Sequence, residues 1–134
     1  MDEQGGGFTL MECVMAIAVV AVMAGLALPN LRGHELRMAR LDAVQALTRV
    51  QTEQEQYRAL NGLYAGELNA LRGVMPRSQQ GRYALGLEVT GPAAYRAVAT
   101  AIGPQMQDRG CGAITLTVNE GFASAGPTPA CWNR

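Results

Sequence analysis

The chain has 134 residues, with 11 basic and 11 acidic side chains, so its formal net charge is zero. This length leaves room for one domain, and the balanced charge gives no general attraction to nucleic acid or to acidic partners. The sequence has one histidine and three cysteines, and it lacks HExxH, CxxC, GxSxG and phosphate-loop motifs. We therefore expect no enzyme, no cofactor and no metal site.

Residues 8–28 form an apolar run that is interrupted only by Thr9 and Glu12. As an α-helix, about 21 residues extend roughly 31 Å, which matches the hydrocarbon core of a bilayer. The preceding residues are acidic and the run ends in LALPN, a pattern that fits a cleaved secretory signal poorly. We therefore predict a transmembrane helix over residues 8–30.

An amphipathic pattern follows over residues 31–60. Apolar side chains recur at spacings of three, four or seven, while most charged side chains occupy the other positions, as in a helix with one buried face. The predicted buried face consists of Leu36, Ala39, Ala43, Leu47, Val50, Tyr57 and Leu60. Asn61 and Gly62 then favour a left-handed C-terminal cap, so we expect one helix to continue from Phe8 to about Leu60.

The rest of the chain changes from a helical to a strand-like period. Residues 61–81 are rich in turn-forming residues and predict an irregular connection with a short helical turn at Glu67–Leu71. Alternating apolar residues over 82–122 then predict an antiparallel meander. Its expected strands are RYALGLEV, AAYRAVATAI, AITLTVN and a short fourth strand from Phe122. The predicted fold class is α+β, with a long N-terminal helix packed on a small antiparallel sheet.

Two of the three cysteines lie near the C-terminus. Cys111 and Cys131 enclose a loop of about 20 residues, and such a pair in an exported domain is typical of a disulfide that contributes about 3 kcal/mol. The alternative is two unrelated thiols in a cytosolic protein, but the membrane segment favours export. Cys13 lies inside the apolar run, where a thiol behaves as a small hydrophobic side chain.

Glu12 is an ionisable side chain placed close to the start of an apolar segment. A carboxylate in a membrane span is unfavourable, although less so near the edge of the bilayer than at its centre. One interpretation is that Glu12 simply reaches the interface. The other is that it awaits a positive partner, and a new amino terminus at Phe8, formed by cutting after Gly7, would be such a charge.

The sequence resembles type IV pilins over its whole length, and most closely minor pilins of the PilE type. The resemblance rests on GFTLMECV with its apolar run and Pro29, on NGLYAGELNALRG, GRYALGLEV and QMQDRGCGAITLTVNEG, and on the ending CW. It implies the type IV pilin fold, with residues 8–30 as a helix that spans the membrane and later forms the filament core. Residues 31–134 would be a periplasmic globular head, whose variable surface is the C-terminal disulfide loop 111–131.

The resemblance also implies how the chain is processed. Residues 1–7 would be a leader, and a prepilin peptidase would cut between Gly7 and Phe8 on the cytoplasmic side. The same enzyme would methylate the amine of Phe8. Glu12 would then serve subunit recognition and docking. These assignments are expectations at this stage.

The expected function is that of a structural subunit of a type IV pilus, which is not an enzyme. The favoured form is a minor pilin that primes or joins pilus assembly. Its partners would be the prepilin peptidase, major and minor pilins, the inner-membrane assembly platform and membrane lipid. The subunit would reside in the inner membrane with a periplasmic head, and after assembly in the extracellular pilus.

Two alternatives stay open. A type II secretion pseudopilin shares the leader and Glu12, but those heads more often hold a metal ion than a terminal disulfide. A DNA-binding minor pilin that acts in DNA uptake would use a patch of basic side chains. The candidates are Arg82, Arg96, Arg109 and Arg134. Nucleic acid is the less favoured partner, because scattered arginines more often form an ordinary solvated surface.

Overall fold

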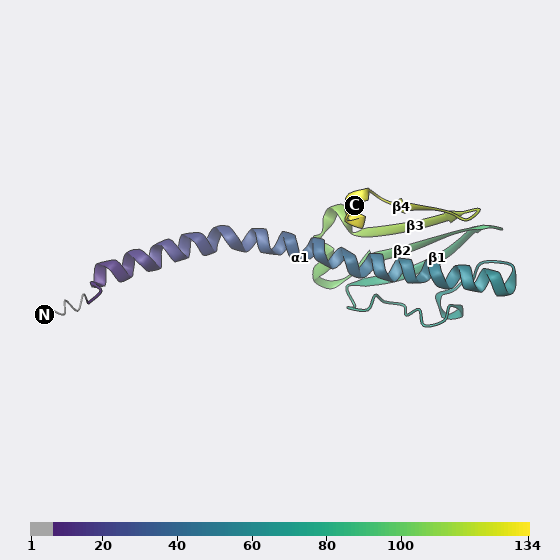
Figure 1. Cartoon of the computed structure of the whole chain (residues 1–134), viewed down its shortest axis with the longest axis horizontal. Helices are drawn as coiled ribbons and strands as arrows, with labels where there is room; N and C mark the ends of the chain where they lie inside the picture. The colour runs from purple at the N-terminus through teal and green to yellow at the C-terminus, as the bar shows by residue number, and fades with distance from the viewer. Residues whose placement is uncertain (1–6) are drawn as a thin grey trace, which may run out of the picture. The chain divides into compact units, whose positions relative to one another are not determined.

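The computed structural model describes residues 7–134, and Figure 1 shows its ribbon. The predicted leader 1–7 therefore lies, except for Gly7, outside the described residues. The chain divides into two compact units, Met1–His34 and Glu35–Arg134, which we call the N-terminal unit and the head unit and describe separately. A single helix, α1 (Leu10–Asn61), contributes to both units.

In the N-terminal unit, α1 begins at Leu10, two residues later than the apolar pattern predicts. Thr9 explains the difference, because its hydroxyl accepts a hydrogen bond from the backbone N–H of Glu12 and caps the helix there. Pro29 lies inside α1 and the helix continues through it. A proline removes one backbone hydrogen bond from a helix without necessarily ending it, as the sequence analysis expected.

In the head unit, α1 presents a buried face that largely follows the predicted spacing. Ala39, Ala43, Leu47 and Val50 are buried. The prediction is wrong for Leu60, which is 86% exposed near the end of the helix. α1 ends at Asn61, and Gly62 adopts a positive φ of 79° while its N–H bonds to the carbonyl of Arg58, which confirms the predicted cap.

Polar side chains on α1 hold the connection between the helix and the sheet. Gln54 is fully buried and forms two hydrogen bonds with the backbone of Ala65, from Nε2 to the carbonyl at 2.9 Å and from the N–H to Oε1 at 2.8 Å. Asp42 is also buried and accepts a hydrogen bond from Ser78. The connection contains one 3₁₀ turn, η1 (Leu68–Ala70), within the short helical turn predicted from the sequence.

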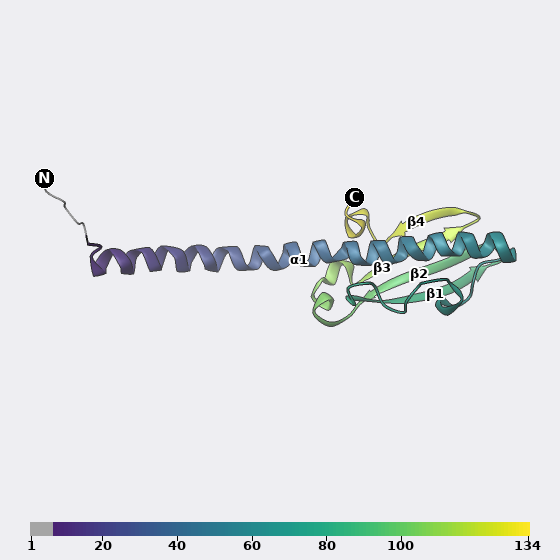
Figure 2. The ribbon, with the colours of Figure 1, turned by 60° about the horizontal axis from the view of Figure 1, so that its bottom comes forward.

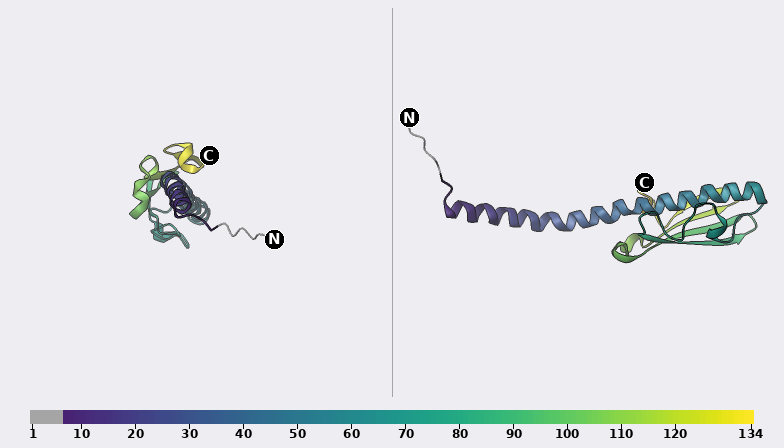
Figure 3. Two further views of the ribbon diagram at one scale, coloured as in Figure 1. Left: turned by 90° about the vertical axis from the view of Figure 1, so that its left-hand side faces the viewer. Right: turned by 90° about the horizontal axis from the view of Figure 1, so that it is seen from below.

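The sheet is an antiparallel meander whose strands follow one another in space as in sequence. The strands are β1 (Tyr83–Gly91), β2 (Ala94–Ala101), β3 (Ala113–Asn119) and β4 (Phe122–Gly126). Figures 2 and 3 show the head-unit part of α1 lying along one face of this sheet. The predicted α+β fold is thus confirmed.

The core lies between the sheet and the head-unit part of α1. Strand pairing aligns one row of side chains on the inner face, because residues directly opposite in antiparallel strands share a face. Tyr95 pairs with Val118, and Ala97 with Leu116, and all four are buried. Short 3₁₀ turns lie at one end of the sheet: η2 (Gly103–Gln107), η3 (Arg109–Cys111) and η4 (Pro129–Trp132).

Candidate functional site

Gly7 and Phe8, where the sequence predicts cutting, lie in an extended, exposed segment before α1. Apart from Gly7 and its chain neighbours, no heavy atom of the described residues lies within 4 Å of the position that a Cβ on Gly7 would take. The Phe8 side chain is 84% exposed. A peptide bond in such a segment is open to a protease, which must approach the backbone closely.

Glu12 and Thr9 bond to each other reciprocally at the start of α1. Carboxylate Oε2 of Glu12 accepts hydrogen bonds from the backbone N–H of Thr9 at 3.3 Å and from its hydroxyl at 3.4 Å. The Thr9 hydroxyl in turn accepts from the Glu12 N–H at 3.3 Å. This arrangement is a capping box, for which TLME has the required S/T-x-x-E spacing. Sequence reasoning assigned Glu12 to docking alone and missed this second role, although the pattern was visible.

In the isolated chain, every residue of the apolar segment that follows Glu12 is exposed to solvent. By length and composition α1 is able to cross a membrane. The large exposed side chains include Val14, Met15, Ile17, Val19, Val20, Val22, Met23, Leu26 and Leu28. A helix that is apolar on all sides must be covered by lipid or by other helices. Cys13 lies in the same stretch as an exposed free thiol.

In the head unit, a charged pair joins α1 to the segment that carries the disulfide. Arg40 donates from Nε and Nη2 to the two carboxylate oxygens of Asp108, at 2.8 and 2.9 Å. The hydrogen bond to Asp108 raises the pKa of Arg40. Gln105 extends the network by donating to the hydroxyl of Tyr83 and to the carbonyl of Leu36, both at 3.0 Å. Burial raises the pKa of Tyr83.

A disulfide joins Cys111 in η3 to Cys131 in η4. The next residue, Trp132, is buried and donates from Nε1 to the carbonyl of Gly126 at 2.9 Å. Arg40 also reaches this loop, because its Nη1 donates to the carbonyl of Ala130 at 3.1 Å. The C-terminal loop is therefore held by one covalent bond and by hydrogen bonds that include those of Trp132 and Arg40.

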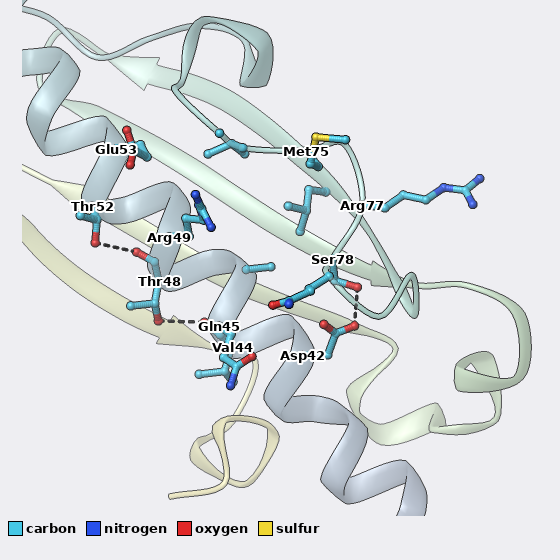
Figure 4. Close-up of a pocket in the computed structure, with 15 residues that line it drawn as sticks. Asp42, Val44, Gln45, Thr48, Arg49, Thr52, Glu53, Met75, Arg77 and Ser78 are labelled. Carbon is cyan, nitrogen blue, oxygen red and sulfur yellow. Dashed lines mark hydrogen bonds between the residues drawn. The ribbon is translucent and has the colours of Figure 1, made fainter.

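An open groove of about 700 Å³ lies between α1 and residues 73–79 of the connection (Figure 4). Its polar side chains mainly serve the fold: the hydroxyl of Ser78 donates to Asp42 at 2.5 Å, and Asp42 also accepts from the N–H of Gln80. Arg49 lies against the backbone of Gly73. Within residues 7–134 no three histidine, cysteine, aspartate or glutamate side chains come together as metal ligands.

A comparison with protein families matches residues 29–115 to the family "Type IV minor pilin ComP, DNA uptake sequence receptor". This match covers more than half of the chain. The chain belongs to this family of type IV minor pilins. The resemblance to type IV pilins inferred from the sequence is thereby confirmed. The matched range begins at Pro29, so it includes the head unit up to β3 but neither Gly7 nor Glu12.

Two curated relatives of this ComP-family pilin are core proteins of type II secretion systems. The type II secretion system core protein G of Dickeya chrysanthemi is 28% identical over 92 residues, which is 69% of this chain and 53% of the relative. The same protein of Pectobacterium carotovorum subsp. carotovorum is 28% identical over 71 residues, or 53% of this chain and 46% of the relative. The chain thus spans about half the length of the curated relatives it matches. The matched family is one of minor pilins, and this chain is a pilin-like structural subunit.

The structure brings together three of the four arginines considered for nucleic acid binding in this ComP-family pilin. Arg82 pairs through its backbone with Ile102, just before η2, while Arg109 begins η3 and Arg134 follows η4. Because the disulfide joins η3 to η4, these three lie at one end of the sheet. Arg96 lies apart from them, on the outer face of β2 opposite Glu88. The expected patch of four is therefore reduced to three.

Proposed function

We propose that this ComP-family pilin is made as a precursor, cut between Gly7 and Phe8, and built into a type IV pilus as a minor subunit. The observation that carries this proposal is the exposed apolar half of α1, with one carboxylate at its start. A soluble single chain has no use for so much exposed apolar surface, whereas a subunit first held in lipid and then in a helical bundle requires it. We also propose that the head unit lies in the periplasm while the apolar half of α1 is in the membrane.

The proposed docking contact pairs Glu12 of one subunit with the Phe8 ammonium of a neighbour. The capping bonds of Glu12 fall on Oε2, so the carboxylate is able to accept from a second partner at Oε1. A helix cap contributes about 1 kcal/mol, whereas leaving one member of a buried ion pair without its partner costs about 3–5 kcal/mol. The pair would therefore fix the axial register between neighbours. Methylation of the Phe8 amine would leave its positive charge in place.

Co-expression with a prepilin peptidase, followed by mass spectrometry of the amino terminus, tests the processing step. We expect the mature chain to begin at Phe8. Gly7→Leu should remain uncut, because the side chain prevents close approach of the peptidase. Gly25→Leu is the matched control, since it makes the same change at an exposed glycine inside α1, and it should be processed normally. A mature chain that begins elsewhere would contradict the proposal.

A second candidate function is DNA binding, which is favoured by the description of the matched family as a DNA uptake sequence receptor. The arginines available for phosphate contacts are Arg82, Arg109 and Arg134. Such contacts release counterions from the DNA, so the amount of duplex DNA that the immobilised chain retains should fall steeply as the salt concentration rises. Replacing the three arginines by glutamine should remove the salt-dependent retention, and absence of retention by the unmodified chain at low salt would exclude this function.

The pseudopilin alternative, supported by the two relatives, is tested by complementation. The chain would be expressed in two kinds of cell: one whose pilus system lacks a minor pilin, and one whose type II secretion system lacks a pseudopilin. We expect incorporation into the pilus. Rescue of secretion without incorporation into pili would instead assign the chain to the secretion system.

A further inference from the structure

Charged side chains are distributed unequally between the two ends of the head unit. At the end where η2, η3 and η4 lie, the arginines are Arg37, Arg82, Arg109 and Arg134, which we call the basic end. A fifth arginine, Arg40, is paired there with Asp108, so the exposed acidic side chain of this end is Glu35. The acidic side chains toward the opposite end are Glu53, Glu55, Glu67, Glu88 and Glu120, and the arginines there are Arg58 and Arg96. Of the other head-unit arginines, Arg49 lies on α1, and Arg72 and Arg77 lie in the connection.

Hydrogen bonds hold the segments of the basic end together. The side chain of Asn133 donates to the carbonyl of Arg37 at 3.4 Å, which places the C-terminal segment beside the first head-unit turn of α1. The Arg40–Asp108 pair adds η3, and the bond from Gln105 to Leu36 adds η2. The four arginines are thus carried by a fixed framework rather than by independent loops.

Exposed apolar side chains accompany the arginines. Met106 in η2 is 65% exposed, and Met38 on α1 is 51% exposed. Both lie next to residues that bind across the basic end, Gln105 and Arg37 respectively. Cationic side chains mixed with flexible apolar side chains are typical of surfaces that rest at the interface between water and lipid.

The basic end is also the end that is attached to the apolar segment. Glu35 follows Leu28 by about seven residues, which corresponds to roughly 10 Å of helical rise. When the apolar segment spans a bilayer, this covalent tether keeps the basic end close to the headgroups. The Debye length at physiological ionic strength is about 8 Å, which is comparable with this rise, so the charges of the headgroups still act on the nearest side chains of the basic end.

We propose that the basic end binds the phosphates of anionic phospholipids while the subunit is stored in the membrane. This inference rests on the membrane anchoring given under the proposed function and adds the lipid class and the contacting residues. DNA would meet the same arginines, but Arg96 lies on another face, opposite Glu88 of β1. The tether and the two methionines favour lipid.

The experiment uses the full chain, in a Cys13→Ala background, inserted into nanodiscs. Trp132 is the sole tryptophan and lies two residues before Arg134, so its fluorescence reports on the basic end. A small fraction of the lipid carries a nitroxide on its headgroup, which quenches nearby tryptophan. The bilayers contain either phosphatidylcholine alone or phosphatidylcholine with phosphatidylglycerol.

We expect quenching to be at least about twofold greater with phosphatidylglycerol, and to return to the phosphatidylcholine level at 0.5 M salt. Arg82→Gln with Arg109→Gln should abolish the difference. Arg72→Gln with Arg96→Gln removes the same charge away from the basic end and should leave the difference intact.

Equal quenching in both bilayers, or equal effects of the two double variants, would overturn the inference. A third outcome would also overturn it: duplex DNA added to phosphatidylcholine nanodiscs changes Trp132 fluorescence, this change requires Arg82 and Arg109, and lipid charge has no effect. A chain that fails to insert into either bilayer overturns the proposed anchoring as well, whereas an inserted chain that ignores lipid charge overturns this inference alone.

Discussion

Arg40 on α1 donates hydrogen bonds to both carboxylate oxygens of Asp108, a residue 68 positions later in the chain. Both side chains are largely shielded from water, with 13% and 8% of their surface exposed. A paired geometry of this kind compensates the loss of hydration that each charge suffers on burial. The pair therefore fixes η3, and with it the disulfide, against the helix, and it supports the surface on which the basic end is built.

Replacing Arg40 by leucine should destabilise the head unit by about 3 kcal/mol, because Asp108 would remain buried without its partner. Guanidinium unfolding of the full chain in detergent micelles, followed by Trp132 fluorescence, measures this change. Arg72→Leu, at an exposed arginine of the connection, should change the free energy of unfolding by less than about 0.5 kcal/mol. Equal effects of the two substitutions would show that the pair contributes nothing specific.

Two buried tyrosines should respond differently to loss of their hydroxyl groups. The hydroxyl of Tyr83 accepts a hydrogen bond from Gln105, whereas within residues 7–134 the hydroxyl of Tyr95 has no hydrogen-bond partner. Tyr83→Phe should therefore cost about 1 kcal/mol of stability, and Tyr95→Phe should be neutral or stabilising. The same unfolding measurement tests both, and a larger loss for Tyr95→Phe would contradict the assigned contacts.

The same tyrosines predict a loss of stability at alkaline pH. Burial raises the pKa of Tyr64, Tyr83 and Tyr95 above the ordinary value of 10.0. Above pH 10 the unfolded chain loses protons that the folded chain keeps, so stability is present below this pH and falls as pH rises further. Between pH 9 and pH 11 Tyr95 alone should account for about 1 kcal/mol of the loss. Unfolding curves at the two pH values should show a smaller loss for Tyr95→Phe than for the unmodified chain.

Apolar periodicity was sufficient to predict the helix, the four strands and most of the helix face that forms the core. It failed at Leu60, Gln54 and Asp42 because burial there depends on contacts across the chain. Leu60 extends beyond the sheet-covered part of α1 and stays exposed, while Gln54 is buried because it satisfies both backbone groups of Ala65. No spacing rule shows which polar side chain will meet a loop that folds back.

The candidate site was predictable to a different extent in each unit. The assignment of cutting to Gly7 and Phe8 and of docking to Glu12 comes from a local sequence motif, and it stays a prediction. The assembly of Arg82, Arg109 and Arg134 at one end depends on the hairpin connections and on the disulfide, so these three arginines could not be distinguished from Arg96 by sequence alone. The Arg40–Asp108 pair was missed for the same reason, since it joins two distant segments.

Removal of the disulfide should destabilise the head unit, because the unfolded chain regains the entropy that the closed loop had removed. The bond joins residues 20 positions apart, which corresponds to about 3 kcal/mol in the chain-entropy estimate. The double variant Cys111→Ser with Cys131→Ser should therefore lose about 3 kcal/mol of unfolding free energy and unfold at a lower guanidinium concentration. Cys13→Ser lies in the N-terminal unit and should leave the transition of the head unit unchanged.

The two roles of Glu12 are separable, because a capping box accepts glutamine in place of glutamate. Glu12→Gln should keep the first turn of α1 protected from amide hydrogen exchange in micelles, yet it should reduce incorporation into pili because the charge for the Phe8 ammonium is gone. Thr9→Val should do the reverse: it removes the hydroxyl that caps the helix, at a cost of about 1 kcal/mol, and leaves the carboxylate available for docking. If Glu12→Gln assembles normally while Thr9→Val does not, Glu12 acts through the helix cap, and the docking pair must be abandoned.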